Sequence, residues 1–322
     1  MSRWPALACP RCRAVLDPDC GEGDVAACVE CGLAFALLHG VRFLADGAAQ
    51  GSTETWQKGI YDALDHQRWG GWRLGRGPDV SLTYRSHCRH IAALEPRPGE
   101  TVLDVGCLDG RRLFEILASF DVSGVGVDLS TAAIGAARAV RHPRARFHAA
   151  SAEALPLADA CCDIAVAMDV LEHTGNPGGA VREVRRCLRA GGRILAHVPV
   201  TDNAGSWDGW MAANRPEEWS ARVRSVGHDY AAMPAAADVR VWLEAAGFAD
   251  VRIERFNAWH QNRFDYYRVH RLLNTLFFVL KLPMALYHDV LARATRLWHV
   301  LDRPRLARGV GGSVYASARV AA

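Results

Sequence analysis

Lysine is almost absent from this chain of 322 residues. Lys58 and Lys281 are the only two, so arginine supplies nearly all of the 38 basic residues, and the formal net charge at pH 7 is only +3. Such a small charge excess provides little of the electrostatic attraction on which nucleic-acid binding depends. The N-terminal region also lacks an apolar run long enough for a signal peptide. We therefore expect a cytoplasmic protein whose surface is not built for nucleic acid.

Half of the ten cysteines lie within the first 31 residues. Four of them form two C-x-x-C pairs with fifteen residues between the pairs, a spacing typical of a zinc ribbon. Four thiolates complete the tetrahedral coordination of Zn²⁺ and leave no open position for catalysis, so the predicted role is structural. A segment of about 45 residues can hardly build a core of its own. The predicted zinc ligands are Cys9, Cys12, Cys28 and Cys31.

The stretch 101–130 predicts a strand, a glycine turn, a helix and a second strand. A short apolar run at 102–105 is followed by Gly106 and Gly110. Apolar residues at helical spacing come next, and then a β-rich run that ends at Asp128. Glycines let a ligand approach the backbone closely, and a carboxylate at the end of the second strand can accept hydrogen bonds from both hydroxyls of a ribose. The unit therefore indicates a nucleoside site.

The acids around the turn distinguish between two classes of nucleoside. A dinucleotide site requires G-x-G-x-x-G, with the pyrophosphate on the helix N-terminus. Here Asp104 precedes the turn and Asp109 lies inside it. Two carboxylates repel a pyrophosphate, whereas they suit a cationic ligand that carries an amino group.

The segment D-V-G-C-L-D-G at 104–110 resembles the D-x-G-x-G-x-G pattern of class I S-adenosylmethionine-dependent methyltransferases. The resemblance implies that Asp104 and Gly106 lie by the methionine moiety and that Asp128 binds the ribose. Leu108 stands where the family usually has a second glycine, and its side chain could crowd the cofactor. The residues implied to bind S-adenosylmethionine are Asp104, Gly106, Cys107, Gly110, Asp128, Leu129, Ser151, Ala152, Glu153 and Asp169.

Two later segments extend this resemblance. The run S-A-E-A-L-P-L at 151–157 resembles the D-A-E-x-L-P-F segment that contacts adenine, with Ser151 in place of the usual aspartate. The order of D-V-L-E-H at 169–173, a predicted helix and an L-x-x-G-G run resembles the pattern of one branch of these enzymes. This is the ubiquinone-methylase-like branch, methyltransferase type 11. The resemblance spans about residues 95–200. It implies an α/β fold with a Rossmann-like sheet of seven strands in the order 3-2-1-4-5-7-6, strand 7 being antiparallel.

The N-terminal sequence resembles small zinc-ribbon proteins that partner methyltransferases. Those proteins end in G-[IV]-x-x-L, which Gly40–Leu44 fits. We predict a zinc ribbon at 1–45, a helical cap and linker at 46–95, and a class I methyltransferase domain at 96–322 with a helical insertion at 263–308.

Methyl transfer from a sulfonium is an in-line displacement. It needs the acceptor atom placed against the methyl group and, for an O–H or N–H acceptor, a base. His173 follows the fourth predicted strand, where open α/β sheets bind their ligands, and His228 and Asp229 adjoin in a loop before a predicted helix. We predict the base among these three residues. Asp169, Glu172 and His173 could instead hold a divalent cation, or Glu172 and His173 could form a structural turn.

The segment 263–308 carries nine basic and three acidic residues, and its centre at 272–280 is strongly apolar. Lys281 and Pro283 interrupt the apolar run, so it is too short for a transmembrane helix. A basic, apolar helix pair can lie on an anionic bilayer, and it can equally pack against the core or a second subunit. Membrane-surface contact and homodimerisation therefore both remain open.

Three functions remain open. The weak charge, the tryptophan-rich segments and the apolar insertion favour O- or N-methylation of a small-molecule or lipid-linked acceptor. The second is an RNA base methyltransferase that docks RNA through its ribbon, as some ribosomal RNA guanine methylases do. Against it, the segment 1–45 is not basic, and no [DN]-P-P-[YF] run follows the fourth strand. The third is a non-catalytic cofactor-binding module, which Leu108 and Ser151 suggest.

Overall fold

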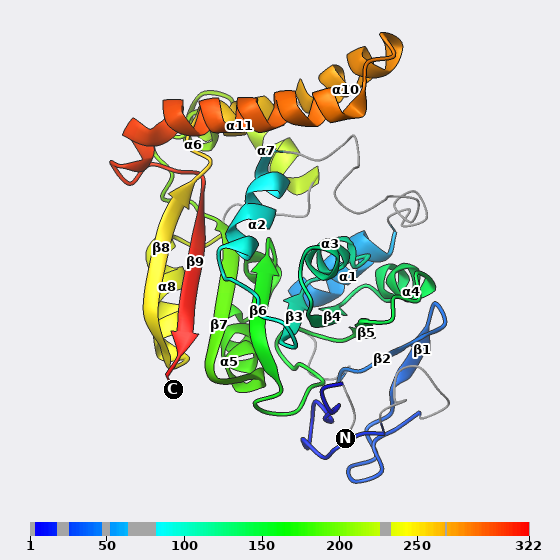
Figure 1. Cartoon of the computed structure of the whole chain (residues 1–322). Helices are drawn as coiled ribbons and strands as arrows, with labels where there is room; N and C mark the ends of the chain where they lie inside the picture. The colour runs from blue at the N-terminus through cyan, green and yellow to red at the C-terminus, as the bar shows by residue number, and fades with distance from the viewer. Residues whose placement is uncertain are drawn as a thin grey trace.

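The computed structural model describes residues 4–17, 26–46, 52–63, 82–225, 233–267 and 269–321. The strands in this part of the chain are β1 (Ala36–Leu38), β2 (Val41–Phe43), β3 (Thr101–Val105), β4 (Ser123–Asp128), β5 (Ala145–Ala149), β6 (Cys162–Met168), β7 (Leu188–Pro199), β8 (Phe248–Phe256) and β9 (Ser313–Val320). They form one nine-stranded sheet in the order β1-β2-β5-β4-β3-β6-β7-β9-β8 (Figure 1).

The sheet is mostly parallel. β3 to β7 pair in parallel, whereas β9 is antiparallel to both β7 and β8. The predicted order 3-2-1-4-5-7-6 is therefore confirmed for β3 to β9. The predicted number of seven strands is wrong, because the N-terminal hairpin of β1 and β2 continues the sheet beyond β5 through the pairing of Phe43 with Ala149. The hairpin covers what would otherwise be an open strand edge.

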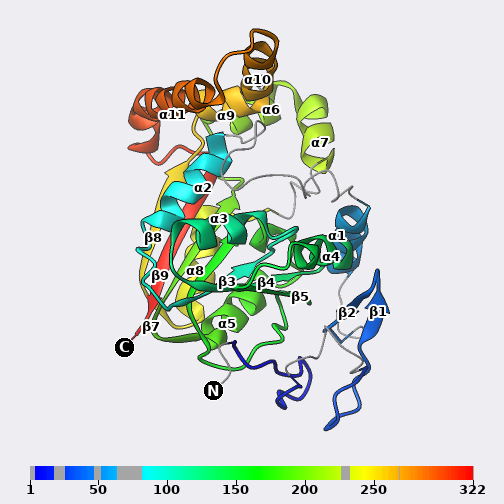
Figure 2. The ribbon, with the colours of Figure 1, turned by 45° about the vertical axis from the view of Figure 1, so that its right-hand side comes forward.

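Helices lie on both faces of the sheet (Figure 2). The helices are α1 (Ser52–Asp62), α2 (Leu82–Ala92), α3 (Arg111–Ser119), α4 (Thr131–Ala139), the 3₁₀ helix η2 (Leu171–His173), α5 (Pro177–Cys187), α6 (Trp207–Asn214), α7 (Pro216–Ser225), α8 (Ala236–Ala245), α9 (His260–Tyr266), α10 (Val269–Val279) and α11 (Met284–Leu306). Ser130 caps α4, as predicted, because its hydroxyl accepts a hydrogen bond from the Ala133 amide at 3.1 Å.

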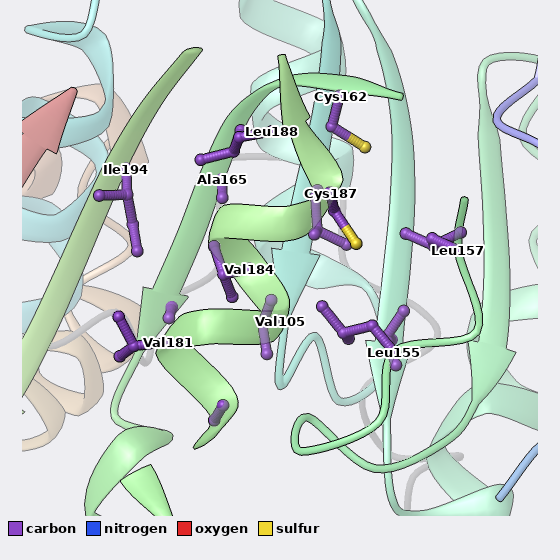
Figure 3. Packing of buried hydrophobic residues seen from close by; sticks show 14 of the residues in the cluster. Val105, Leu155, Leu157, Cys162, Ala165, Val181, Val184, Cys187, Leu188 and Ile194 are labelled. Atoms are coloured by element: carbon purple, nitrogen blue, oxygen red, sulfur yellow. The ribbon is translucent and has the colours of Figure 1, made fainter. Parts of the chain in front are cut away.

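Alternation along β3 divides the core into two layers. Leu103 and Val105 join the apolar cluster that contains α5 and α8, and Val181 and Val184 of α5 belong to this layer (Figure 3). Val102 joins the cluster on the other face with residues of α3 and α4. Asp104 has the same parity as Val102. Its carboxylate therefore faces the α3 side of the sheet.

The N-terminal region is attached to the sheet by more than the hairpin. Leu7 and Leu157 form an isolated antiparallel bridge, and the amide of Ala8 donates to the carbonyl of Pro156 at 3.1 Å. Arg13 pairs with Glu183 of α5 at 2.8 Å.

The helices α9 to α11 lie between β8 and β9 in the chain, and α10 and α11 extend along one end of the molecule (Figure 1). They have a small apolar cluster of their own, which consists of Phe277, Tyr287 and Leu291. Among the helices described, none combines the length and the apolar character that crossing a membrane requires.

Candidate active site

A cavity of about 330 Å³ lies where β3, β4 and β6 end. This is the edge at which open α/β sheets bind ligands, and the volume falls within the range of about 300–1,000 Å³ that is usual for ligand pockets. The predicted cofactor residues that line it are Gly106, Cys107, Asp128, Leu129, Ala152 and Asp169. Those that do not line it are Asp104, Gly110, Ser151 and Glu153.

The turn after β3 needs its first glycine for two reasons. Gly106 has φ +67°, a left-handed conformation that side chains disfavour. A Cβ atom at this position would also overlap the side chain of Val170. The bare backbone therefore forms the floor of the cavity.

Leu108 adopts a glycine-like conformation without being glycine. Its φ is +49°, and it lines the cavity. The carboxylate of Asp128 stabilises this turn, because Oδ2 accepts from the Leu108 amide and Oδ1 from the Ser130 amide, each at 2.8 Å. Asp128 thus fixes the turn after β3 while it faces the cavity.

Asp104 is fully buried, and within the described ranges neither of its carboxylate oxygens has a hydrogen-bond partner. Burial raises the pKa of Asp104 to about 7, and Arg112, whose Nη1 lies 3.8 Å from Oδ1, opposes this shift. A buried acid without hydrogen bonds is costly. Since this carboxylate does not line the cavity, its contact with a methionine moiety stays a prediction.

In the segment 151–157, which was expected to contact adenine, two of the predicted cofactor side chains bond to the protein itself. Ser151 is buried, and its hydroxyl accepts a hydrogen bond from the Glu153 amide at 3.0 Å. Glu153 accepts from the amide of Asn176 at 2.9 Å. These two side chains organise the loop, while Ala152 lines the cavity.

His173 lines the cavity with Tyr61 of α1, and the two rings meet edge to face with centroids 6.2 Å apart. Its Nε2 lies 3.9 Å from Oε1 of the fully buried Glu172. The alternative cation site at Asp169, Glu172 and His173 is not one of the metal-ligand clusters that the described residues form. His228 and Asp229 lie outside the described residues.

Asp169 lies at the end of β6 with φ +58°. Its Oδ1 accepts from Nδ1 of His197 at 2.5 Å, and His197 Nε2 lies 2.8 Å from Oγ of Ser313. Burial raises the pKa of Asp169, but the neighbouring His197 and His87 outweigh this effect, so its pKa lies well below the ordinary value. Asp169 is therefore an ionised carboxylate in the cavity wall.

The four predicted zinc ligands are gathered in one cluster. The Sγ atoms of Cys9 and Cys31 are 3.7 Å apart, as are those of Cys12 and Cys28. A tetrahedron with Zn–S bonds of about 2.3 Å has edges of about 3.75 Å. The donor set and its spacing therefore fit a four-thiolate zinc site.

Several cavity residues were not predicted from the sequence. Tyr61 and Tyr84 come from α1 and α2, Arg112 from α3, and Thr174 from the loop after η2. The segment 53–94 is rich in aromatic residues, and this richness is the sequence feature that could have indicated a role of the two tyrosines in the cavity. Burial raises the pKa of each tyrosine above its ordinary value, so both phenols stay neutral.

The strand order, the glycine turn and the acid at the end of β4 define a class I S-adenosylmethionine-dependent methyltransferase domain. Comparison with known proteins supports this class, because residues 103–196 match the family described as "Methyltransferase domain". This segment therefore matches the family that the sequence resembles, and the match supports S-adenosylmethionine as the cofactor.

The relatives differ in what they act on. The chain is 28% identical over 222 residues to a tRNA U34 carboxymethyltransferase of Methylococcus capsulatus, covering 65% of this chain and 62% of the relative. It is 32% identical over 142 residues to an O-methyltransferase of Pyrenophora dematioidea, covering 42% and 53%. The first curated relatives are thus matched over less than two thirds of their own length. They leave the acceptor open.

Solved structures agree on the fold. Phosphoethanolamine N-methyltransferase 2 of Haemonchus contortus, in complex with phosphomonomethylethanolamine and S-adenosylhomocysteine, has a TM-score of 0.57 at 15% identity. The match covers 85% of this chain and 61% of that one. At this identity the likeness concerns the fold alone.

Proposed function

We propose that this protein transfers the methyl group of S-adenosylmethionine to an oxygen or nitrogen atom of a small-molecule or lipid-linked acceptor. The observation that carries the proposal is the cavity at the ends of β3, β4 and β6, with a bare glycine backbone as its floor and Asp128 in its wall. The buried Asp104 beside it lacks hydrogen-bond partners that an amino group would provide.

The residues of the chain have distinct roles in this proposal. Asp128 accepts from the ribose hydroxyls through the lone pairs that its two backbone donors leave, and Asp104 faces the amino group. Gly106, Cys107 and Gly110 shape the turn, while Leu129, Ser151, Ala152 and Glu153 shape the adenine end. When bound, S-adenosylmethionine supplies an electrophilic methyl group on a sulfonium.

The base in this proposal is His173. It lies in the cavity wall, and its side chain is 11% exposed, so it is shielded from bulk water but open to a ligand. The edge contact with Tyr61 holds the ring in place. A histidine takes up a proton near neutral pH with little cost. His228 and Asp229 remain the alternative proposal.

We propose a structural Zn²⁺ at Cys9, Cys12, Cys28 and Cys31. Its function is to hold the N-terminal region in the shape that docks against the sheet, since the four thiolates leave no open coordination position. The bridge from Leu7 to Leu157 and the ion pair from Arg13 to Glu183 support this role.

The experiment that tests the function uses S-adenosylmethionine with a labelled methyl group. Purified protein is incubated with host extract, and the RNA, lipid and small-molecule fractions are separated. We expect label in the lipid or small-molecule fraction and none with His173→Ala. Label in RNA would overturn the proposed acceptor class and would support RNA docking through the ribbon. Cofactor binding without transfer to any fraction would support a non-catalytic module.

The insertion supports a lipid-linked acceptor through its surface. Apolar side chains at the end of α10 and in the turn after it are exposed, with Phe278 at 80%, Val279 at 66% and Leu280 at 56% of their full area. Exposed apolar patches mark interaction sites. The segment 263–308 carries nine basic and three acidic residues, so its charge complements an anionic headgroup layer. We propose that this turn inserts into an anionic bilayer.

Sedimentation with phosphatidylglycerol vesicles tests this surface. We expect the wild type to pellet with the vesicles and Phe278→Glu to remain in solution. Val241→Glu is the matched control, because Val241 of α8 is also exposed, at 58%, but lies outside the insertion. Equal binding by all three proteins would contradict the proposal. A concentration-dependent dimer that Phe278→Glu disrupts, with no vesicle binding, would assign the same surface to a second copy.

A further inference from the structure

A second metal-ligand cluster lies behind the cavity wall. It consists of His87 on α2, Asp169 after β6 and His197 on β7, whose ligand atoms all lie within 4.8 Å of one another. The three residues come from elements far apart in the sequence. The two imidazole rings meet with centroids 4.6 Å apart.

His87 is the member of this cluster that the protein does not otherwise satisfy. Its exposure is only 2%, and neither ring nitrogen has a hydrogen-bond partner among the residues that the structure describes. The nearest carboxylate atom, Oδ2 of Asp169, lies 3.8 Å from Nε2, which is too far for a hydrogen bond. Leaving a buried polar group unpaired costs about 1–3 kcal/mol. Such a residue needs a partner that the described part of the chain does not supply.

The 3.8 Å approach of Asp169 leaves both nitrogens of the buried His87 ring without a close partner in the described part of the chain. An imidazole nitrogen with an available lone pair is the group through which histidine binds metals.

We propose that His87, Asp169 and His197 bind a divalent metal ion of the zinc type. Two imidazoles and one carboxylate are the donors that such ions take in sites with three protein ligands. Ligand atoms about 2.05 Å from a tetrahedral ion are about 3.4 Å apart. The distances from Asp169 to His197 and to His87, 2.5 Å and 3.8 Å, lie on either side of this value. Small side-chain rotations therefore suffice to close the site.

Ser313 provides the second contact that such a site requires. Because a carboxylate only accepts, His197 carries its hydrogen on Nδ1 when it bonds to Asp169. Metal binding through Nδ1 needs the other neutral tautomer, with the hydrogen on Nε2. Oγ of Ser313, 2.8 Å from Nε2, can accept that hydrogen and so orient the ring.

The site would be separate from the four-cysteine cluster, and it would share Asp169 with the wall of the cavity. Phe256 and Tyr315 flank His197, with ring centroids 6.1 Å and 4.8 Å away, which keeps the ion in apolar surroundings. Asp169 also lines the cavity. The ion would therefore hold this carboxylate in the wall, whichever acceptor the protein uses. The inference does not depend on the proposed methyl transfer.

The first test is the zinc content of the purified full-length protein after equilibration with Zn²⁺ and desalting. We expect two zinc ions per chain in the wild type, one in His87→Gln and one in Cys28→Ser. His142→Gln is the matched control, because His142 lies before β5 and away from the cluster, and it should retain two. A single zinc per chain, lost in Cys28→Ser but kept in His87→Gln, would overturn the proposal.

Cobalt titration makes the test independent of how well the variants fold. Co²⁺ at four thiolates gives an intense charge-transfer absorption, whereas Co²⁺ at two histidines and a carboxylate gives only weak visible bands. We expect the wild type to saturate at two equivalents, one of each kind. Saturation at one equivalent with the thiolate spectrum alone would contradict the proposal, even if His87→Gln failed to fold.

Discussion

Replacing Asp128 with asparagine should weaken both the turn and cofactor binding. The carboxylate accepts from the amides of Leu108 and Ser130, each at 2.8 Å. An amide side chain offers only one acceptor oxygen, so its NH₂ group would face the second backbone N–H. The variant thus loses one hydrogen bond to a charged group and converts the other to a neutral one.

The magnitude follows from these two bonds. A hydrogen bond to a charged group contributes about 1.5–3 kcal/mol, and the converted bond loses about 0.5–1 kcal/mol, so the free energy of unfolding should fall by about 2–4 kcal/mol. At about 2.1 cal/mol/K per residue, a chain of 322 residues changes its Tm by about 1.5 °C per kcal/mol. We therefore expect Tm to fall by about 3–6 °C. Loss of the ribose acceptor should weaken S-adenosylmethionine binding by about 10- to 100-fold.

The assay is thermal unfolding by circular dichroism with calorimetric titration of S-adenosylmethionine. Asp121→Asn is the matched control. Its carboxylate is 82% exposed and pairs with Arg144 at 3.3 Å, so its loss should cost less than about 1 kcal/mol. If Asp128→Asn behaves like this control in both measurements, the reasoning about the turn is refuted. A lower Tm with unchanged affinity would refute only the ribose contact.

Three further variants test other parts of the site. Gly106→Ala should lower Tm and cofactor affinity, because the added Cβ atom would overlap the side chain of Val170 and because φ at this position is positive. Adding Val170→Ala should restore part of the lost Tm and part of the lost affinity. No recovery in the double variant would show that the overlap is not the cause. The pKa of Asp104 is raised to about 7, so the folded state holds more protons than the unfolded state between about pH 4 and pH 7, and stability falls as pH rises through this window. Asp104→Asn should therefore raise Tm relative to the wild type at pH 8 but not at pH 4. If the Tm of the variant and the Tm of the wild type change with pH in the same way, Asp104 is not the source of the pH dependence. Cys28→Ser should abolish zinc binding at the four-cysteine cluster, and both this variant and the chelated wild type should expose 26–46 to limited proteolysis. Unchanged protection would mean that the metal does not hold this region.

Local patterns in the sequence predicted most of the central fold. The glycine turn, the helix after it and the cap at Ser130 each depend on residues within a few positions of one another. Strand order also followed from the family resemblance. The extra strands β1 and β2 were not predicted, because three-residue strands carry too little periodicity to identify.

The candidate site was predicted less completely than the fold. Gly106 and Asp128 belong to the βαβ unit identified from the sequence, and both line the cavity. The later motif at 151–157 did not predict that the Ser151 hydroxyl accepts a hydrogen bond from its own loop. His87 could not be connected with Asp169 from the sequence, since α2 and β6 meet only through tertiary packing. The position of a single histidine in a sequence does not predict which distant residues it will contact.

The pairing of β2 with β5 sets an order of events during synthesis. The ribosome completes the N-terminal hairpin about a hundred residues before it makes Ala145–Ala149. At about 5–20 residues per second, the hairpin emerges about 5–20 s before its partner strand exists. The hairpin therefore cannot join the sheet until its partner strand β5 has been made. Zinc capture by the nascent chain would give this segment its shape during that interval, so zinc supply would govern how efficiently newly made chains mature.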